Sequence, residues 1–135
     1  MLTSLAGLTN FALYFAVAIG LLLAFKFIYA LITPYDEWKL VREEQNVAAA
    51  TGFTGAIIGF SLALASAAAN SISLLDFAIW GVIGLVAQIL AFMILRFVFM
   101  PKLVQRIKDN EISAGIMLGG LSVAVGLLNA ACMTY

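Results

Sequence analysis

Residues 39–46 read KLVREEQN and residues 102–110 read KLVQRIKDN, so two charged stretches of this chain open on the same three letters. They interrupt 135 residues of which 64% are hydrophobic and 10% are charged, with a mean hydropathy of +1.11. A soluble domain usually carries about 45–50% apolar and about 25% charged residues. The composition therefore indicates an integral membrane protein, which leaves the lipid at the two charged stretches.

Four apolar blocks surround these stretches, at about 5–32, 47–69, 74–100 and 112–134. Each is long enough to cross a bilayer, which takes about 20 helical residues. The runs are continuous and lack a period of two, which favours helices over barrel strands. The first block has no basic residue before it and is longer than a signal-peptide core, so we expect a retained helix. The sequence predicts an all-α integral membrane protein with four transmembrane helices in a single membrane domain, 1–135.

The basic residues predict which way the chain faces. All seven lie in or near the two charged stretches, and residues 1–5, 70–76 and 129–135 contain no lysine or arginine. Because cytoplasmic loops of membrane proteins carry the excess of Lys and Arg, we expect both charged stretches in the cytoplasm and both termini outside, N-out and C-out. Tyr29, near the cytoplasmic end of the first block, is expected in the inner aromatic belt.

The shared KLV letters also suggest an internal repeat. A shift of 63 residues aligns 39–41 with 102–104 and places small residues opposite small residues through the helices that follow. We interpret the chain as two tandem helical hairpins, a 2+2 repeat, with unit one at about 1–70 and unit two at about 71–135. Since each unit crosses the membrane twice, the units share one topology and a pseudo-twofold axis along the membrane normal. Chance similarity between glycine- and alanine-rich helices is the alternative.

Glycines mark one face of the second and fourth predicted helices. GAIIG at 55–59 and GIMLG at 115–119 are both small-xxx-small patterns, which permit close backbone approach between helices in lipid. We therefore expect the two helices to meet each other, or to meet their counterparts in a homo-oligomer. The candidate helix-packing residues are Gly52, Gly55, Gly59, Gly115, Gly119 and Gly126.

Polar residues follow these glycines toward the outer ends of the same helices. Ser66, Asn70, Asn129 and Cys132 are candidates for a small polar pocket or pore mouth. The alternative is that they form interhelical hydrogen bonds, which are common in membrane proteins and contribute about 0.6 kcal/mol each. Gln88, deep in the third helix, is expected to be such a packing contact.

The cytoplasmic stretches hold a second set of candidates. We expect Lys26, Trp38, Arg42, Arg96 and Arg106 to act as cytoplasmic anchors or partner contacts. Lys26 and Arg96 fall within predicted spans, where a long basic side chain can reach back to the interface. For Lys26 the alternative is a buried partner, such as a backbone carbonyl of the second helix.

The sequence lacks the residues that several functional classes require. The chain has no histidine, a single cysteine and a net charge of zero. It contains no nucleophile beside a base, no glycine-rich phosphate loop and no acidic residue deep within a predicted span, since Asp76 lies at the outer end of the third block. We therefore expect no enzyme activity, no metal or other cofactor, and no nucleic acid among its partners.

Three stretches resemble a known family: ITPYDEW at 32–38, VAAATGFTGAIIG at 47–59 and NAACMTY at 129–135. Together they are similar to the YjfL-like family of small bacterial inner-membrane proteins, which carry a domain of unknown function. The resemblance implies a multi-pass protein of the bacterial inner membrane with no established activity and no assigned functional residues. The gene neighbours of the family imply a soluble cytoplasmic partner that acts in envelope stress.

Two functions remain open. The first is an oligomer-forming structural or adaptor component of the envelope, whose basic turns recruit a soluble partner or membrane lipid. The second is a small oligomeric channel or transporter lined by the second and fourth helices. The polarity of such a path does not decide between the two functions. Hydroxyl and amide groups are present along it, but there is no ring of charged residues.

Overall fold

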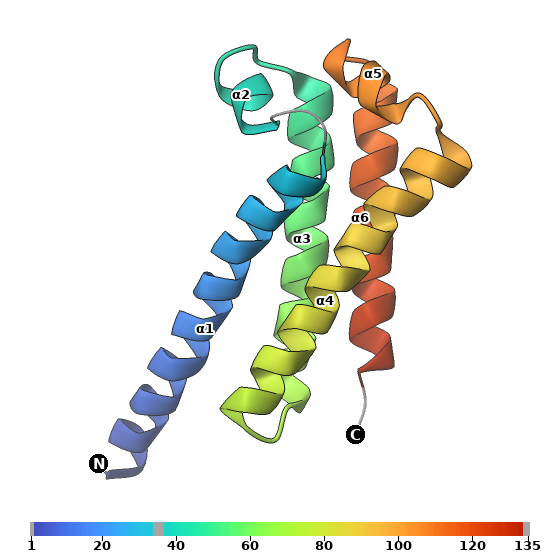
Figure 1. The fold of residues 1–135 in the computed structure, drawn as a ribbon. Coiled ribbons are helices and arrows are strands. Elements are labelled where there is room, and N and C mark those ends of the chain that lie inside the picture. The colour runs from blue at the N-terminus through green and yellow to red at the C-terminus, as the bar shows by residue number, and fades with distance from the viewer. Residues whose placement is uncertain (1, 34–36, 134–135) are drawn as a thin grey trace.

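A computed structural model of the protein describes the backbone of residues 2–33 and 37–133 and the side chains of residues 4–33 and 39–133. The described residues form helices joined by short connections (Figure 1). In chain order the elements are α1 (Leu2–Ile32), α2 (Glu37–Arg42), α3 (Val47–Asn70), α4 (Leu74–Ile94), the π-helical turn η1 (Leu95–Phe99), α5 (Leu103–Lys108) and α6 (Ile112–Cys132).

Four segments are long and apolar enough to cross a membrane: Ser4–Ile32, Val47–Asn70, Leu74–Phe99 and Ile112–Cys132. This confirms the predicted all-helical membrane domain with four spanning segments. The charged stretches, which we expected to be plain turns, each contain a short helix. The short helices form because they bury apolar side chains against the bundle, namely Leu40 in α2 and Leu103 and Ile107 in α5.

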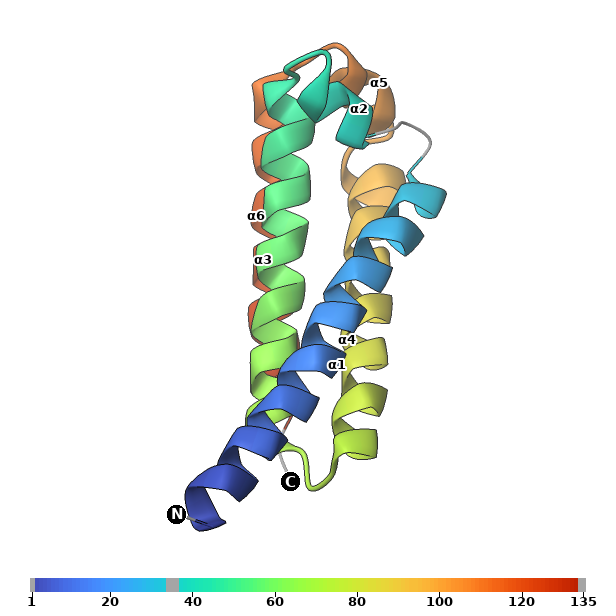
Figure 2. The same ribbon diagram turned by 90° about the vertical axis from the view of Figure 1, so that its left-hand side faces the viewer.

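The long helices alternate in direction. α1 and α4 run toward the end of the bundle that holds α2 and α5, and α3 and α6 run back to the end where α1 begins (Figures 1 and 2). We call these two ends the turn end and the termini end. α3 and α6 are therefore parallel, and they contact each other along their length. α1 lies on the outside, since 11% of its most apolar window is buried against 56% for α3.

An aromatic cluster joins α1, α3 and α4 near the turn end. The ring of Phe25 stacks on Phe60 with centroids 4.7 Å apart, and Tyr29 meets the edge of Phe92 at 5.7 Å. Tyr29 is 1% exposed, so its predicted place in the inner aromatic belt is wrong. The reason is that the second half of α1 packs against α3 and α4, which cover the face that carries this ring.

The third span changes its winding before it ends. Leu95–Phe99 forms a π-helical turn in which the backbone N–H of Met100 donates to the carbonyl of Leu95 at 2.7 Å. Pro101 follows and has no N–H with which to extend the helix. The helix that we expected to run regularly to residue 100 therefore finishes in a wider turn, a rare form that mostly occurs as a single-turn insertion.

Candidate functional site

The glycines of α3 and α6 face one another and set the distance between the two helices. A β-carbon on Gly55 would overlap the Cα of Gly119, and one on Gly59 would overlap the carbonyl oxygen of Ser122. A β-carbon on Gly126 would in turn overlap the carbonyl oxygen of Gly59. Residues with side chains could not approach so closely, which is the use that helices in lipid make of small residues.

The remaining glycines extend this contact toward the turn end. A β-carbon on Gly115 would overlap the backbone of Ala48, and one on Gly52 would lie 2.8 Å from Cδ2 of Leu118. The structure thus places all six candidate packing glycines at one interface within a single chain. These faces of α3 and α6 are covered by protein, and we call the interface the glycine contact.

Two asparagines at the turn end link the halves of the chain. Asn46 caps α3, because its Oδ1 accepts from the backbone N–H of Ala49 at 2.8 Å, while its Nδ2 donates to the carbonyl of Ile107 in α5 at 2.8 Å. From the other half, Oδ1 of Asn110 accepts from the backbone N–H of Ala48 at 3.0 Å. Asn46 and Asn110, which we call the asparagine clasp, therefore hold the connections before α3 and α6 together.

Both connections use the left-handed backbone region. Gln45 has a φ of 51° and Asn110 a φ of 58°, and each lies two residues before the start of a long helix. Asparagine is among the non-glycine residues that adopt this region most readily. Sequence analysis missed the clasp, although an asparagine directly before an apolar run, as at Asn46, is a recognisable helix N-cap signal.

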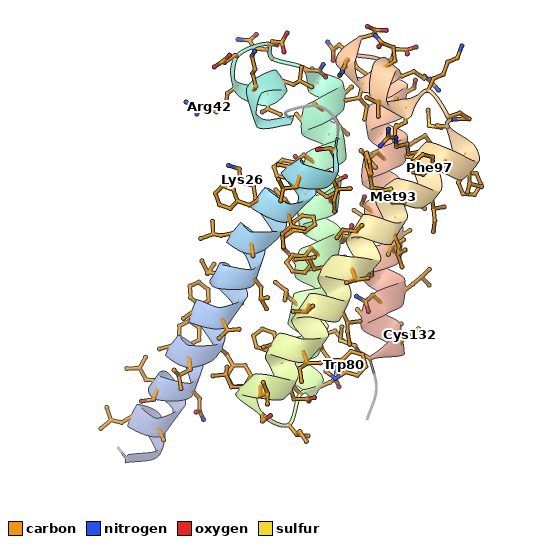
Figure 3. The ribbon with its side chains drawn as sticks, viewed as in Figure 1. Lys26, Arg42, Trp80, Met93, Phe97 and Cys132 are labelled. Carbon is orange, nitrogen blue, oxygen red and sulfur yellow. The ribbon has the colours of Figure 1, made fainter. Side chains whose placement is uncertain are left out.

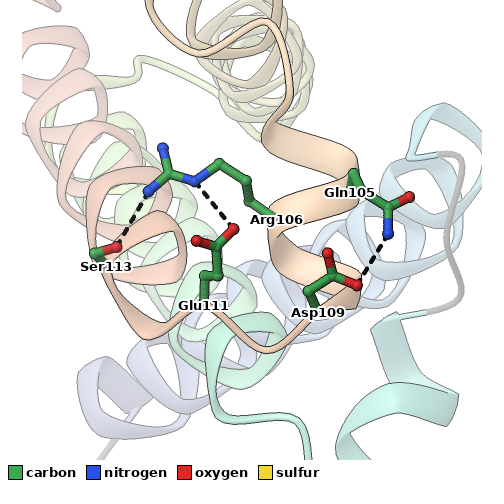
Figure 4. Close-up of polar contacts among 5 residues, drawn as sticks. All are labelled: Gln105, Arg106, Asp109, Glu111 and Ser113. Atoms are coloured by element: carbon green, nitrogen blue, oxygen red, sulfur yellow. Dashed lines mark hydrogen bonds and ion pairs between the residues drawn. The ribbon is translucent and has the colours of Figure 1, made fainter.

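Five basic residues lie in or beside the short helices of the turn end, and side-chain contacts hold one of them, Arg106 (Figure 4). Nε of Arg106 lies 3.2 Å from Oε2 of Glu111, and its Nη2 donates to Oγ of Ser113 at 3.3 Å. Gln105 donates to Asp109 at 2.9 Å. The Arg106 and Glu111 side chains are 35% and 47% exposed, so solvent screens their attraction. The basic turn surface consists of Lys39, Arg42, Lys102, Arg106 and Lys108.

Two further basic residues lie within the spans, near the turn end. Nζ of Lys26 lies 5.0 Å from the ring centroid of Phe27, and Cζ of Arg96 lies 5.0 Å from the ring centroid of Phe97. Both rings are exposed, so each cation shares the outer face of its helix with an aromatic ring. Figure 3 shows Lys26 directed away from the bundle. The side chain of Trp38, the fifth predicted anchor, lies outside the described residues.

The predicted polar residues of the termini end point in different directions. Oγ of Ser66 donates to a backbone carbonyl of α6 at 2.9 Å, and Nδ2 of Asn70 donates back to the carbonyl of Ser66 at 2.9 Å. Asn129 is directed toward α4, where its Nδ2 lies 3.3 Å from the position of a β-carbon on Gly84. Cys132 is exposed. Ser66 therefore bonds α3 to α6, while Asn129 packs against a third helix.

Gln88 brings α4 to the glycine contact. Its side chain is 1% exposed, and its Nε2 donates to the carbonyl of Ser122 at 3.0 Å. The same nitrogen lies 2.7 Å from the position of a β-carbon on Gly59, so the glycine makes room for it. Oε1 of Gln88 and Oγ of Ser122 are buried with no hydrogen-bond partner among the described residues.

The acidic side chains within residues 39–133 lie at or beside connections: Asp76 in the first turn of α4, Glu43 and Glu44 after α2, and Asp109 and Glu111 before α6. Across residues 4–33 and 39–133, no three His, Cys, Asp or Glu side chains gather closely enough to hold a metal ion.

Four apolar spanning helices, a close glycine contact and a charged turn end define a multi-pass helical membrane protein. Residues 2–133 match the family described as Domain of Unknown Function (DUF350), and the chain belongs to this family.

Two relatives show how far this likeness extends. The chain is 40% identical to the UPF0719 inner membrane protein YjfL of Escherichia coli (strain K12) over 131 residues, 97% of this chain and 98% of that protein. It is 28% identical to the UPF0719 transmembrane protein YshE of Bacillus subtilis (strain 168) over 125 residues, 92% of each. No solved structure matches the chain. The relatives and the four apolar helices identify a multi-pass inner-membrane protein and confirm the resemblance seen in the sequence.

Proposed function

We propose that the chain is a structural or adaptor protein of the bacterial envelope, without enzyme activity, whose basic turn surface recruits a soluble cytoplasmic partner or anionic lipid. The asparagine clasp carries this proposal. Because Asn46 bonds to α5 and Asn110 bonds to the first turn of α3, the two basic turns are held next to each other. Cations with a fixed spacing favour one acidic partner over another through complementary charge.

The proposal requires the turn end to face the cytoplasm, with both termini periplasmic. It is supported by the distribution of charge, since the seven basic residues lie at or near the turn end and residues 43–95 contain none. Positive charge of this kind marks cytoplasmic loops. The anionic lipids of the cytoplasmic leaflet would attract these side chains by about 1 kcal/mol for each Lys or Arg near the surface.

We also propose that the chain consists of two tandem hairpin units. Each unit would comprise a long helix, a short helix and a second long helix, and the left-handed residues Gln45 and Asn110 each lie two residues before α3 or α6. If YDEW at 35–38 is an insertion in the first connection, the first helices of the two units align at a shift of 67 and Phe25 matches Phe92. These two rings are 1% and 0% exposed in the same aromatic cluster. The parallel directions of α3 and α6 agree with this interpretation.

The second hypothesis, a channel or transporter lined by α3 and α6, has less support. The glycine faces that would line a path are packed against each other inside one chain. The exposed surfaces of the two helices carry apolar side chains, among them Ile58 on α3 and Ile116 and Leu127 on α6. We therefore propose that a homo-oligomer forms through lipid-facing surfaces such as that of α1, with no polar path between copies.

Partner recovery from native membranes tests the adaptor function. The double variant Arg42→Gln, Arg106→Gln should insert as the wild type does but lose soluble proteins and anionic lipids that copurify in mild detergent. Gln105→Ala, a neutral change on the same short helix as Arg106, is the matched control and should keep them. If the double variant retains every partner, the adaptor function is wrong. A closed ring in native mass spectrometry together with ion or solute flux would favour the channel instead.

A further inference from the structure

An apolar groove lies between α1, α3 and α4 in the half of the bundle nearer the termini end. Its volume is about 380 Å³. α1 contributes large side chains, including Phe11 and Phe15, and α3 contributes small ones, including Ala65 and Ala68, with the buried ring of Phe77 from α4 between them. The groove exists because α1 packs closely against the other helices near the turn end and leaves them toward its start (Figure 1).

The residues on the α3 side form a second small-residue face of that helix. Ser61, Ala65 and Ala68 recur at helical spacing, on a different face from the glycine contact with α6. α1 does not fill the space beside them, although its Tyr14 stacks on Phe77 with centroids 5.3 Å apart. The groove lies entirely on segments long and apolar enough to span the membrane, so hydrocarbon is the medium around it.

We infer that one acyl chain of a membrane phospholipid occupies this groove. The groove-lining stretch of α1, from Phe11 to Leu22, rises about 16 Å at 1.5 Å per residue. This is about half the thickness of a hydrocarbon core of about 30 Å, which is the depth that one acyl chain of one leaflet spans.

Charge indicates the kind of phospholipid. Residues 1–25 and 43–95 contain no lysine or arginine, so no cationic side chain from α3, the first part of α1 or the start of α4 reaches an anionic headgroup here. Asp76 immediately precedes the groove residue Phe77. A zwitterionic headgroup that carries an amine, as in phosphatidylethanolamine, fits this end of the bundle better than an anionic one. The acyl chain in the groove keeps α1 and α3 in contact with hydrocarbon where the two helices do not touch each other.

Photolabelling of the full-length protein in vesicles tests the inference. The probe is phosphatidylethanolamine that carries a diazirine near the end of one acyl chain, and labelled peptides are located by mass spectrometry. Labels should concentrate on residues 11–22 and 61–68. Ala65→Phe, which fills the groove from an exposed position, should abolish that concentration, whereas Ala124→Phe, at an exposed position of α6, should leave it unchanged.

Each other result overturns the inference. Labels spread evenly over the four spans would mean that the lipid contacts are unselective. Labelling that persists in both Ala65→Phe and a second groove-filling variant, Ala68→Leu, would show that the acyl chain lies elsewhere. A Phe15→Cys variant in a Cys132→Ser background reports on a second copy, because disulfide-linked dimers through this cysteine would place another protein chain in the groove.

Discussion

The Cα of Gly119 occupies the place that a β-carbon on Gly55 would need, so the backbones of α3 and α6 touch at this pair. We predict that Gly55→Ala lowers the free energy of unfolding by about 1–3 kcal/mol, the usual cost of overpacking, because the helices must separate. Unfolding in mild detergent, followed by circular dichroism, measures the effect. Gly120→Ala is the matched control, since a β-carbon there meets nothing within 4 Å. Equal stability of the two variants would contradict the close contact.

Asn46 provides the second prediction, because it combines a helix cap with a bond between the two turns. Asn46→Ala should lower stability by at least about 1 kcal/mol, the typical cost of losing an N-cap side chain. Asn46→Asp should keep the cap to Ala49 but lose the donor to Ile107. Hydrogen exchange should then rise in α5 more than in α3, and unchanged exchange in α5 would argue against the clasp.

The ion pair of Arg106 and Glu111 should contribute little to stability. Both side chains are substantially exposed, and exposed pairs contribute about 0–1 kcal/mol. We therefore expect Arg106→Gln to unfold at nearly the wild-type temperature while binding less to vesicles that contain anionic lipid. Glu111→Gln, which frees the guanidinium, should bind at least as well as the wild type. A large loss of stability in Arg106→Gln would indicate a structural role instead.

Cys132 reports the orientation of the chain without any engineered cysteine. It is the single cysteine of the sequence and is exposed at the end of α6, as Figure 3 shows. A membrane-impermeant maleimide added to spheroplasts should label it, because we place the termini end in the periplasm. In a Cys132→Ser background, Lys108→Cys at the turn end should react after the membrane is permeabilised and not before. The reverse pattern would invert the topology.

Gln88 should stabilise the fold through its packing and one hydrogen bond. Gln88→Met keeps the volume and removes the bond to the Ser122 carbonyl, so we expect a change of about 0.6 kcal/mol or less. Gln88→Ala should cost at least about 2 kcal/mol, because it leaves a cavity among α3, α4 and α6. Thermal unfolding of the two variants separates packing from polarity. If Gln88→Met is as damaging as Gln88→Ala, the amide has a role beyond packing.

Most of what could be predicted follows from properties of single segments of the chain. The four spans follow from continuous apolar blocks, and the connections follow from the charged letters between them. The candidate packing face also followed from glycine spacing, since a helix repeats its faces regularly. Tyr29 was misplaced for a related reason: its position along α1 suggested the interface, but α3 and α4 cover the face on which it lies. Depth in the membrane is a property of one helix, whereas burial depends on its neighbours.

The sequence by itself determined the class of protein, the number of spans and the charged end, because hydropathy and charge are summed along about 20 consecutive residues. The tertiary structure alone decided that the glycine faces meet each other within one chain, that Asn46 and Asn110 join the turns, and that a groove opens beside α1. These features depend on contacts between segments about sixty residues apart, such as the hydrogen bond from Asn46 to Ile107, with a separation of 61. The local sequence pattern indicates which helix faces are able to pack, and the spatial arrangement of the helices decides which of these faces are in contact.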